Sequence, residues 1–157
     1  MPDMLVKLYE LPDDAPLRAK LEDAGFTIRR ALVPEKHLIR GWVKEKFNPH
    51  WESECDVAIS GHPTSCFIAT LEDKLVGFAC YDATCKGFFG PTGVDDVCRG
   101  KGVGTGLLLA CLHDMRAQGY GYAVIGGAGP VAFYEKTVGA IEIPDSKPGI
   151  YKGMLRS

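Results

Sequence analysis

Several features are scarce or missing in this chain of 157 residues, and each absence excludes a class of function. There is no basic excess: 18 lysines and arginines face 20 aspartates and glutamates, so a general electrostatic grip on nucleic acid or anionic lipid is not expected. No apolar run is long enough to span a bilayer, and the first residues lack the basic and apolar segments of a secretory signal. We therefore expect a cytoplasmic protein that binds neither nucleic acid nor a membrane.

The cysteines also lack an arrangement that points to chemistry. None of the six belongs to a Cys-x-x-Cys pair, and in a reducing compartment we interpret them as small buried apolar side chains. Zinc binding is the alternative, with His62 and Cys66, or Cys80 and Cys85, as ligands, but neither spacing matches a common zinc finger or ribbon. The prediction is that no metal is bound.

The length and the hydrophobic pattern indicate one mixed α/β domain. A chain of this size can bury a substantial core, and it shows no internal repeat. Strands are predicted at residues 4–9, 26–32, 65–70, 75–81, 86–94, 122–125, 140–143 and 150–155. Helices are predicted at residues 15–24, 34–47, 51–60, 102–118 and 131–138. The alternation of strands and helices in the second half favours a sheet covered by helices.

Three of these elements carry sharper expectations. Pro91 lies inside a predicted strand, and because proline removes a ladder donor, a bulge or a strand edge is expected there. The entirely apolar strand at 122–125 is predicted to be buried on both faces. In the helix that begins near Pro34, Leu38 and Trp42 are predicted to face the core.

The most informative segment runs from Val94 to Gly106, with the sequence Val-Asp-Asp-Val-Cys-Arg-Gly-Lys-Gly-Val-Gly-Thr-Gly. It follows a predicted strand and opens the long helix. The first amides of a helix have no partner inside the helix, and the helix dipole adds partial positive charge to them. Glycines let a phosphate approach the backbone closely, and Arg99, Lys101 and Thr105 add donors. These properties predict a phosphate or pyrophosphate site; a glycine-rich turn without a ligand is the alternative.

Two common phosphate motifs do not fit this loop. A Walker loop needs Ser or Thr after Gly-Lys, but Gly102 follows Lys101. A Gly-x-Gly-x-x-Gly fingerprint fails from Gly100, where the last position is Thr105, and from Gly102, where it is Leu107. With these two motifs excluded, the pattern to be explained is Arg-Gly-x-Gly-x-Gly, which follows a predicted strand that ends in valine.

This segment resembles the signature of the GCN5-related N-acetyltransferase (GNAT) superfamily, whose loop pattern is Arg/Gln-x-x-Gly-x-Gly/Ala. The resemblance extends over about residues 26–155. It implies an acyl-CoA N-acyltransferase domain at residues 26–157, with residues 1–25 as an N-terminal strand–helix addition. The implied fold is a mixed, mostly antiparallel central sheet with helices on both faces.

The resemblance also implies a cofactor site and an acid. Backbone amides over Arg99, Gly100, Lys101, Gly102, Val103, Gly104 and Thr105 would hold the pyrophosphate of acetyl-CoA, the expected co-substrate. The amide near Val94 would face the thioester carbonyl and stabilise an oxyanion. The run Phe133-Tyr134-Glu135-Lys136 matches a helix in the family, and in many members that tyrosine protonates the departing thiolate. Tyr134 is the candidate acid; a tyrosine packed on the sheet is the alternative.

The chain departs from the family pattern in two places. Gly127 and Pro130 stand where many members have asparagine and alanine, so a side-chain contact with the cofactor arm is lost. The strand before the loop has no glutamate to act as general base. Asp95 or Asp96 could serve, or both could be solvated loop carboxylates while the acceptor loses its proton to water.

The expected function is transfer of an acetyl group from acetyl-CoA to an amine of a small molecule or peptide, and a homodimer would fit the family. The regions at 34–60 and 144–149 are expected to set the acceptor. A non-catalytic CoA-binding sensor or assembly protein is one alternative. A nucleotide-binding oxidoreductase is another, because residues 127–132 fit Gly-x-Gly-x-x-Ala and Asp145 follows, but only 25 residues follow Ala132 and the Arg99 loop is left unexplained.

Overall fold

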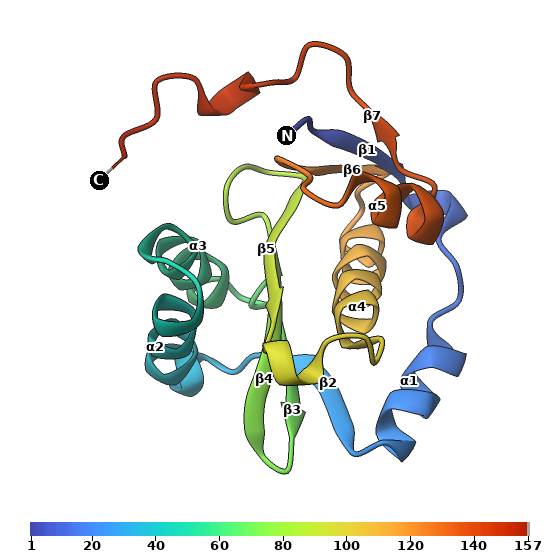
Figure 1. Cartoon of the computed structure of the whole chain (residues 1–157), viewed down its shortest axis with the longest axis vertical. Helices are drawn as coiled ribbons and strands as arrows, with labels where there is room; N and C mark the ends of the chain where they lie inside the picture. Colours follow the sequence, from blue (N-terminus) through green and yellow to red (C-terminus); the bar gives the residue numbers. More distant parts are fainter. Residues whose placement is uncertain (157) are drawn as a thin grey trace.

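A single seven-stranded sheet organises the chain in the computed structural model, which describes residues 1–156 (Figure 1). The strands are β1 (Met4–Lys7), β2 (Phe26–Arg30), β3 (Cys66–Leu71), β4 (Lys74–Tyr81), β5 (Phe88–Val94), β6 (Tyr122–Ile125) and β7 (Ile141–Glu142). Their order is β2-β3-β4-β5-β6-β1-β7, and all neighbours are antiparallel except β5 and β6, which are parallel.

Helices cover both faces of this sheet. They are α1 (Ala15–Asp23), α2 (Lys36–Lys46), α3 (Pro49–Ser60), α4 (Val103–Ala117) and α5 (Val131–Val138). In Figure 1, α2 and α3 lie on one side of β3–β5, while α1, α4 and α5 lie on the other. The predicted mixed, mostly antiparallel fold with helices on both faces is therefore confirmed.

The hairpin between β3 and β4 shows how local sequence sets the topology. Glu72 and Asp73 form a two-residue turn with positive φ angles of 51° and 62°. This left-handed geometry matches the twist of antiparallel strands, which fixes the β3–β4 register.

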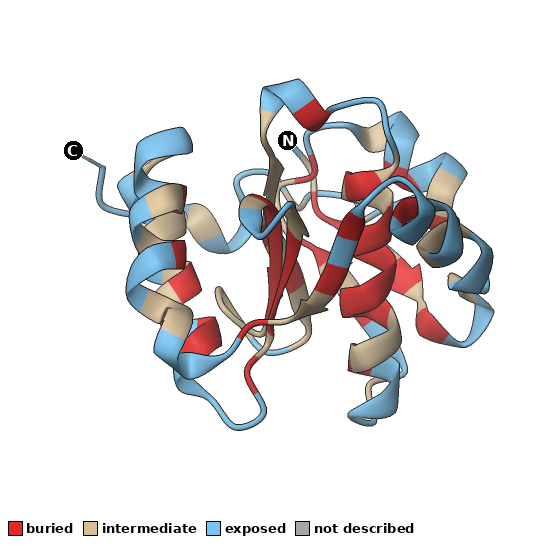
Figure 2. Ribbon diagram, turned by 90° about the horizontal axis from the view of Figure 1, so that it is seen from below, coloured by how far each residue is buried: buried red, intermediate tan, exposed pale blue. Residues whose placement is uncertain are grey.

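The two faces have separate cores. Leu107, Leu112 and Met115 of α4 are fully buried against one face of the sheet. On the other face, Trp42, Phe47 and Trp51 surround the buried Phe78, with ring centroids 6.3, 5.8 and 6.1 Å from it. Figure 2 shows the buried residues on the sides of the helices that face the sheet. Trp42, which is predicted to face the core, is thus part of an aromatic layer between α2, α3 and β4.

Strand β5 parts from its neighbour β6 partway along its length. It pairs with β6 only through Phe88 and Phe89, because β6 ends at Ile125 while β5 continues to Val94. The β4–β5 register shifts between Ala79 and Tyr81, opposite Gly90 and Pro91, which confirms the predicted irregularity at this proline. Within residues 1–156, the β6-side edge of the second half of β5 consequently pairs with no strand.

Several details of the sequence prediction were wrong. Residues 150–155 form no strand, because Gly149 and Gly153 have left-handed φ angles of 60° and 78° that break an extended path. Tyr122 is 52% exposed, so β6 is buried fully on one face only. Leu38 is 65% exposed, because Ile39 and Val43 are the α2 residues that face the sheet.

The N-terminal segment contributes a strand to the same sheet. Strand β1 lies between β6 and β7, and its Met4 and Val6 are fully buried. These residues share the core of the rest of the chain. The predicted domain boundary at residue 25 is not tested by this packing and stays a prediction.

Five of the six cysteines are buried and Cys85 is partly exposed, in agreement with their interpretation as apolar side chains. Among residues 1–156, no three His, Cys, Asp or Glu side chains are grouped to hold a metal ion. Nor does that part of the chain include a helix long and apolar enough to cross a membrane.

Candidate active site

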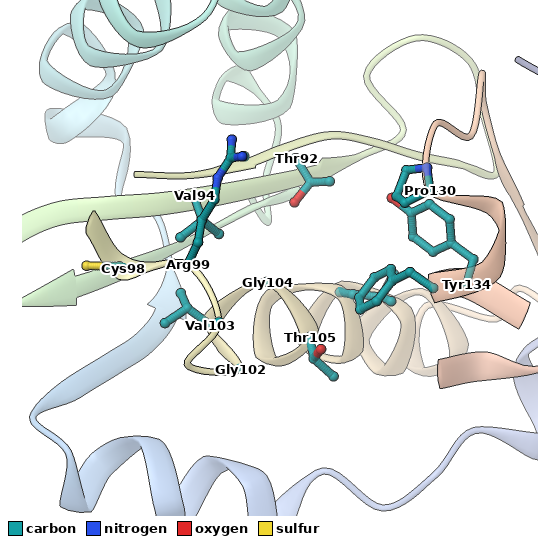
Figure 3. A pocket seen from close by; sticks show the side chains of 14 residues that line it. Thr92, Val94, Cys98, Arg99, Gly102, Val103, Gly104, Thr105, Pro130 and Tyr134 are labelled. Carbon is teal, nitrogen blue, oxygen red and sulfur yellow. The ribbon is translucent and has the colours of Figure 1, made fainter. Parts of the chain in front are cut away.

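A pocket of about 440 Å³ lies where β5 parts from β6 (Figure 3). It is lined by Thr92, Gly93, Val94, Cys98, Arg99, Gly100, Gly102, Val103, Gly104, Thr105, Leu108, Pro130, Phe133 and Tyr134. These residues come from three places: the free edge of β5, the start of α4 and the start of α5. The structure therefore brings together Tyr134 and all the residues predicted for the cofactor site except Lys101, which is exposed and does not line the pocket. The candidate bases Asp95 and Asp96 do not line it either.

The loop before α4 presents a row of free amides. Gly102 has φ +88°, and α4 starts at the next residue. The first recorded hydrogen bond of the helix is donated by Gly106 to the Gly102 carbonyl, at 2.9 Å. The backbone N–H groups from Gly100 to Thr105 donate no hydrogen bond to any residue in the described part of the chain. Such a run of amides at a helix N-terminus is a site for an anion.

The shape of this loop depends on glycine at position 102. A side chain there would need a left-handed backbone that L-residues rarely adopt, and a Cβ would lie 3.2 Å from Cδ1 of Leu17. Gly100 is also left-handed, with φ +77°. The sequence therefore specifies a loop whose amides stay close to the pocket.

Hydrogen-bond alternation directs Val94 toward the pocket. The Asp95 amide donates to the Val76 carbonyl at 2.8 Å, and Val94 stands opposite Gly77. In an antiparallel ladder, hydrogen-bonded and non-hydrogen-bonded pairs alternate, so Val94 belongs to a non-hydrogen-bonded pair. Its N–H and C=O point away from β4, toward the gap that lies beside β5.

Tyr134 lies on the opposite wall. It projects from α5 toward β5 in Figure 3, is 6% exposed, and contacts Phe133 edge-to-face with centroids 5.2 Å apart. Burial raises the pKa of its phenol. Its hydroxyl donates no hydrogen bond to a residue within 1–156, so its proton is available to a molecule in the pocket.

The two acidic candidates of the loop are engaged elsewhere. Asp95 caps the short 3₁₀ turn η3 (Asp96–Cys98) by accepting from the Val97 amide at 3.3 Å, and Lys46 Nζ lies 3.5 Å from its carboxylate. Asp96 is largely exposed and pairs with Arg99 at 3.1 Å. These contacts give both carboxylates local structural partners.

The second glycine-rich segment, at 127–132, is occupied by the N-terminus. The Gly127 amide donates to Asp3 Oδ1 at 2.8 Å, and the Ala128 amide donates to the Pro2 carbonyl at 2.8 Å. These amides are therefore not available to a dinucleotide phosphate, which removes the structural basis of the oxidoreductase alternative. Sequence reasoning missed Asp3, since a lone aspartate 124 residues away from its partner carries no local signal.

The acetyltransferase (GNAT) family model matches residues 30–140, which is more than half of the chain. No curated protein sequence matches the chain significantly.

Solved structures share the fold at low sequence identity. A GCN5-related glucosamine N-acetyltransferase region of a fungal multi-domain β-N-acetylglucosaminidase is 15% identical, with a TM-score of 0.74 over 90% of this chain and 19% of that one. A GCN5-related N-acetyltransferase from Sphaerobacter thermophilus is 19% identical, with a TM-score of 0.68 over 90% of this chain and 48% of that one. This chain thus spans less than half of either protein.

A GNAT family acetyltransferase from Brucella melitensis, solved in complex with acetyl-CoA, is 19% identical, with a TM-score of 0.52 over 71% of this chain and 80% of that one. The family match and the shared architecture agree with the open strand edge and the amide-lined helix start. The chain belongs to the acetyltransferase (GNAT) family.

Proposed function

We propose that this protein transfers the acetyl group of acetyl-CoA to the nitrogen of an amine, in a small molecule or a peptide. The observation that carries the proposal is the convergence in one pocket of unpaired loop amides, an unpaired strand edge and a buried tyrosine with a free hydroxyl. Each element supplies a function that acyl transfer from a thioester requires.

The loop fits the pyrophosphate of coenzyme A. The amides from Gly100 to Thr105 offer consecutive donors at the positive end of the α4 dipole. Arg99 lines the pocket and is held by Asp96, while Lys101 lies on the exposed side of the loop. In this assignment the amides bind and Lys101 contributes long-range attraction.

The strand edge and the tyrosine would act on the thioester, which supplies the activated acetyl group. The Val94 N–H is directed toward the gap, where it can donate to the carbonyl oxygen as negative charge develops on it. Tyr134 can give its proton to the sulfur as the C–S bond breaks. Because its pKa is raised, the phenol stays protonated across the neutral range.

A non-catalytic CoA-binding role is the second candidate. It is favoured by the absence of a carboxylate on β5 and by the engagement of Asp95 and Asp96 in local contacts. Under this reading the loop would bind the cofactor and no acyl transfer would follow.

Calorimetric titration with acetyl-CoA, with NAD as control, tests the site, and thiol release with a panel of amines tests the reaction. Micromolar binding of acetyl-CoA with amine-dependent thiol release is the expected result. Binding without release from any amine would favour the non-catalytic role. Absence of acetyl-CoA binding would overturn the assignment of the loop.

A further inference from the structure

The proposed reaction needs a group that removes a proton from the acceptor. Amines are mostly protonated at neutral pH, and an ammonium nitrogen has no lone pair with which to attack a thioester. Strand β5 has no carboxylate, and Asp95 and Asp96 are engaged. Water is one proton acceptor; a side chain that takes this role without leaving such a contact comes from another element, and the side of β5 that faces α2 and α3 offers one.

The face of α3 toward β5 is identified by Trp51 and Phe47. The two rings lie 5.0 Å apart, and the Phe47 ring covers Gly93 so closely that a Cβ there would lie 2.4 Å from Cζ. Gly93 also lines the cofactor pocket. Glu54 follows Trp51 by three residues, which places both on the same side of the helix. Glu54 is therefore on the α3 face that looks onto β5.

Two further side chains gather around Glu54. The Thr84 hydroxyl, in the loop between β4 and β5, donates a hydrogen bond to the Glu54 carboxylate. Tyr151, in the 3₁₀ turn η4 (Gly149–Tyr151), places its hydroxyl over the end of β6, where a Cβ on Gly126 would lie 2.7 Å from it and 2.9 Å from Phe88 Cδ2. The Glu54 charge and the Thr84 hydroxyl both act on the pKa of Tyr151, so the three side chains lie together on the α3 side of the sheet, near the end of β6. None of them lines the pocket described above.

Tyr134 lies near the same point, where β5 and β6 part, but on the other face of the sheet. Phe89 and Ile125 belong to the core on the α4 side, so Phe88 and Gly126, the adjacent positions, face the α3 side. Tyr134 also belongs to the α4-side core. Glu54 and Tyr134 therefore approach β5 from opposite faces of the sheet.

The surroundings of Glu54 suit a base. It is half-buried and forms no ion pair with the side chains described for residues 1–156. Burial raises its pKa, and the Thr84 hydrogen bond and the nearby His50 offset part of this effect. The other titratable groups near Glu54 and Tyr151 are Asp3 and Cys85. Burial and then the charge of Glu54 raise the pKa of Tyr151. The negative charge of the Glu54 carboxylate thus has no cationic partner among these side chains, and a bound ammonium group would supply one.

We propose that Glu54 is the residue that binds the ammonium group of the acceptor and takes its proton. This inference rests on the proposed function. An N–H bond breaks and the proton moves to the Glu54 carboxylate; the freed lone pair forms the N–C bond at the carbonyl carbon. The C–S bond breaks and the thiolate takes the Tyr134 proton. The second proton that the nitrogen loses passes to water, and water returns a proton to Tyr134. Glu54 then releases its proton to water.

The test compares Glu54→Gln with Glu52→Gln, a matched change on the same helix, where Glu52 lies 3.7 Å from Arg40. Two acceptors are used: phenethylamine, which is protonated at neutral pH, and trifluoroethylamine, which is uncharged. With phenethylamine, Glu54→Gln should lower kcat on the order of 100-fold, and the loss should shrink as the pH rises. With trifluoroethylamine the change should stay below about threefold. Equal losses for both amines, or no loss, would overturn the assignment.

A binding measurement separates this inference from the proposed function. If the wild-type protein releases no thiol with either amine, acetyl transfer to them fails, and phenethylamine is titrated into the protein mixed with coenzyme A. At least tenfold weaker binding in Glu54→Gln, with binding retained in Glu52→Gln, would support the ammonium site. Equal binding in both variants, or no binding by the wild type, would reject it.

Discussion

Arg30 and Asp114 form a bidentate ion pair that ties strand β2 to helix α4 across 84 residues of sequence, with N–O distances of 2.7 and 3.0 Å. The Tyr81 hydroxyl donates to the same carboxylate at 2.5 Å, so β4 is included in the network. Since α4 begins at the glycine loop, this contact helps to fix the helix that carries the proposed cofactor site.

Replacing Asp114 with alanine should lower the free energy of unfolding by about 2 kcal/mol, because Arg30 and Tyr81 would lose their shared acceptor in a half-buried site. Urea unfolding of this variant measures the effect. Arg116→Ala, an exposed change on the same helix, is the control and should stay within about 0.5 kcal/mol of the wild type. A loss for Asp114→Ala no larger than that of the control would show that the network does not stabilise the fold.

Replacing Gly102 with glutamate should abolish acetyl-CoA binding, with a loss of at least about 100-fold in affinity, because a carboxylate would stand beside amides proposed to bind pyrophosphate. The matched control is Gly41→Glu, at an exposed helical position where a Cβ meets nothing within 4 Å. Thermal unfolding first confirms that both variants are folded. Calorimetric titration with acetyl-CoA then measures the affinity of each. Wild-type affinity in Gly102→Glu would exclude this loop as the phosphate site.

Replacing Tyr134 with phenylalanine should lower kcat on the order of 100-fold and leave the affinity for acetyl-CoA unchanged, since only the proton donor is removed. The raised pKa of Tyr134 means that wild-type turnover should begin to lose this acid only above about pH 10, the ordinary phenol value. Tyr122→Phe, at an exposed tyrosine, serves as the control. An unchanged rate in Tyr134→Phe would assign the hydroxyl a packing role.

Replacing Glu54 with glutamine should stabilise the fold at neutral pH while it impairs turnover. A carboxyl whose pKa is raised on folding favours the folded state below its unfolded pKa, and this contribution is lost as the pH rises through the raised folded value. The stability difference between Glu54→Gln and the wild type should therefore be small near pH 4 and grow toward neutral pH. Thermal unfolding at a series of pH values measures it, and a difference that does not vary with pH would contradict the burial of this carboxylate.

Local rules predicted most of the elements and the cofactor loop. The 3.6-residue pattern after Gly102 and the glycines before it are short-range signals, and each specifies a conformation without help from the rest of the chain. The strand prediction for residues 150–155 failed because Gly149 and Gly153 break the extended path. The prediction for Tyr122 failed because the strand propensity of a segment says nothing about whether a second layer covers both of its faces.

The mixed α/β class and the helix start that offers free amides could be predicted from the sequence, because these depend on residues within a few positions of one another. Tyr134 was a candidate only through the resemblance of residues 133–136 to the family. Tertiary structure alone decided that Asp3 occupies the second glycine segment, that Val94 points toward a gap and that Glu54 meets Thr84 and Tyr151. Those contacts join residues far apart in the chain, and strand pairing and helix packing bring them together.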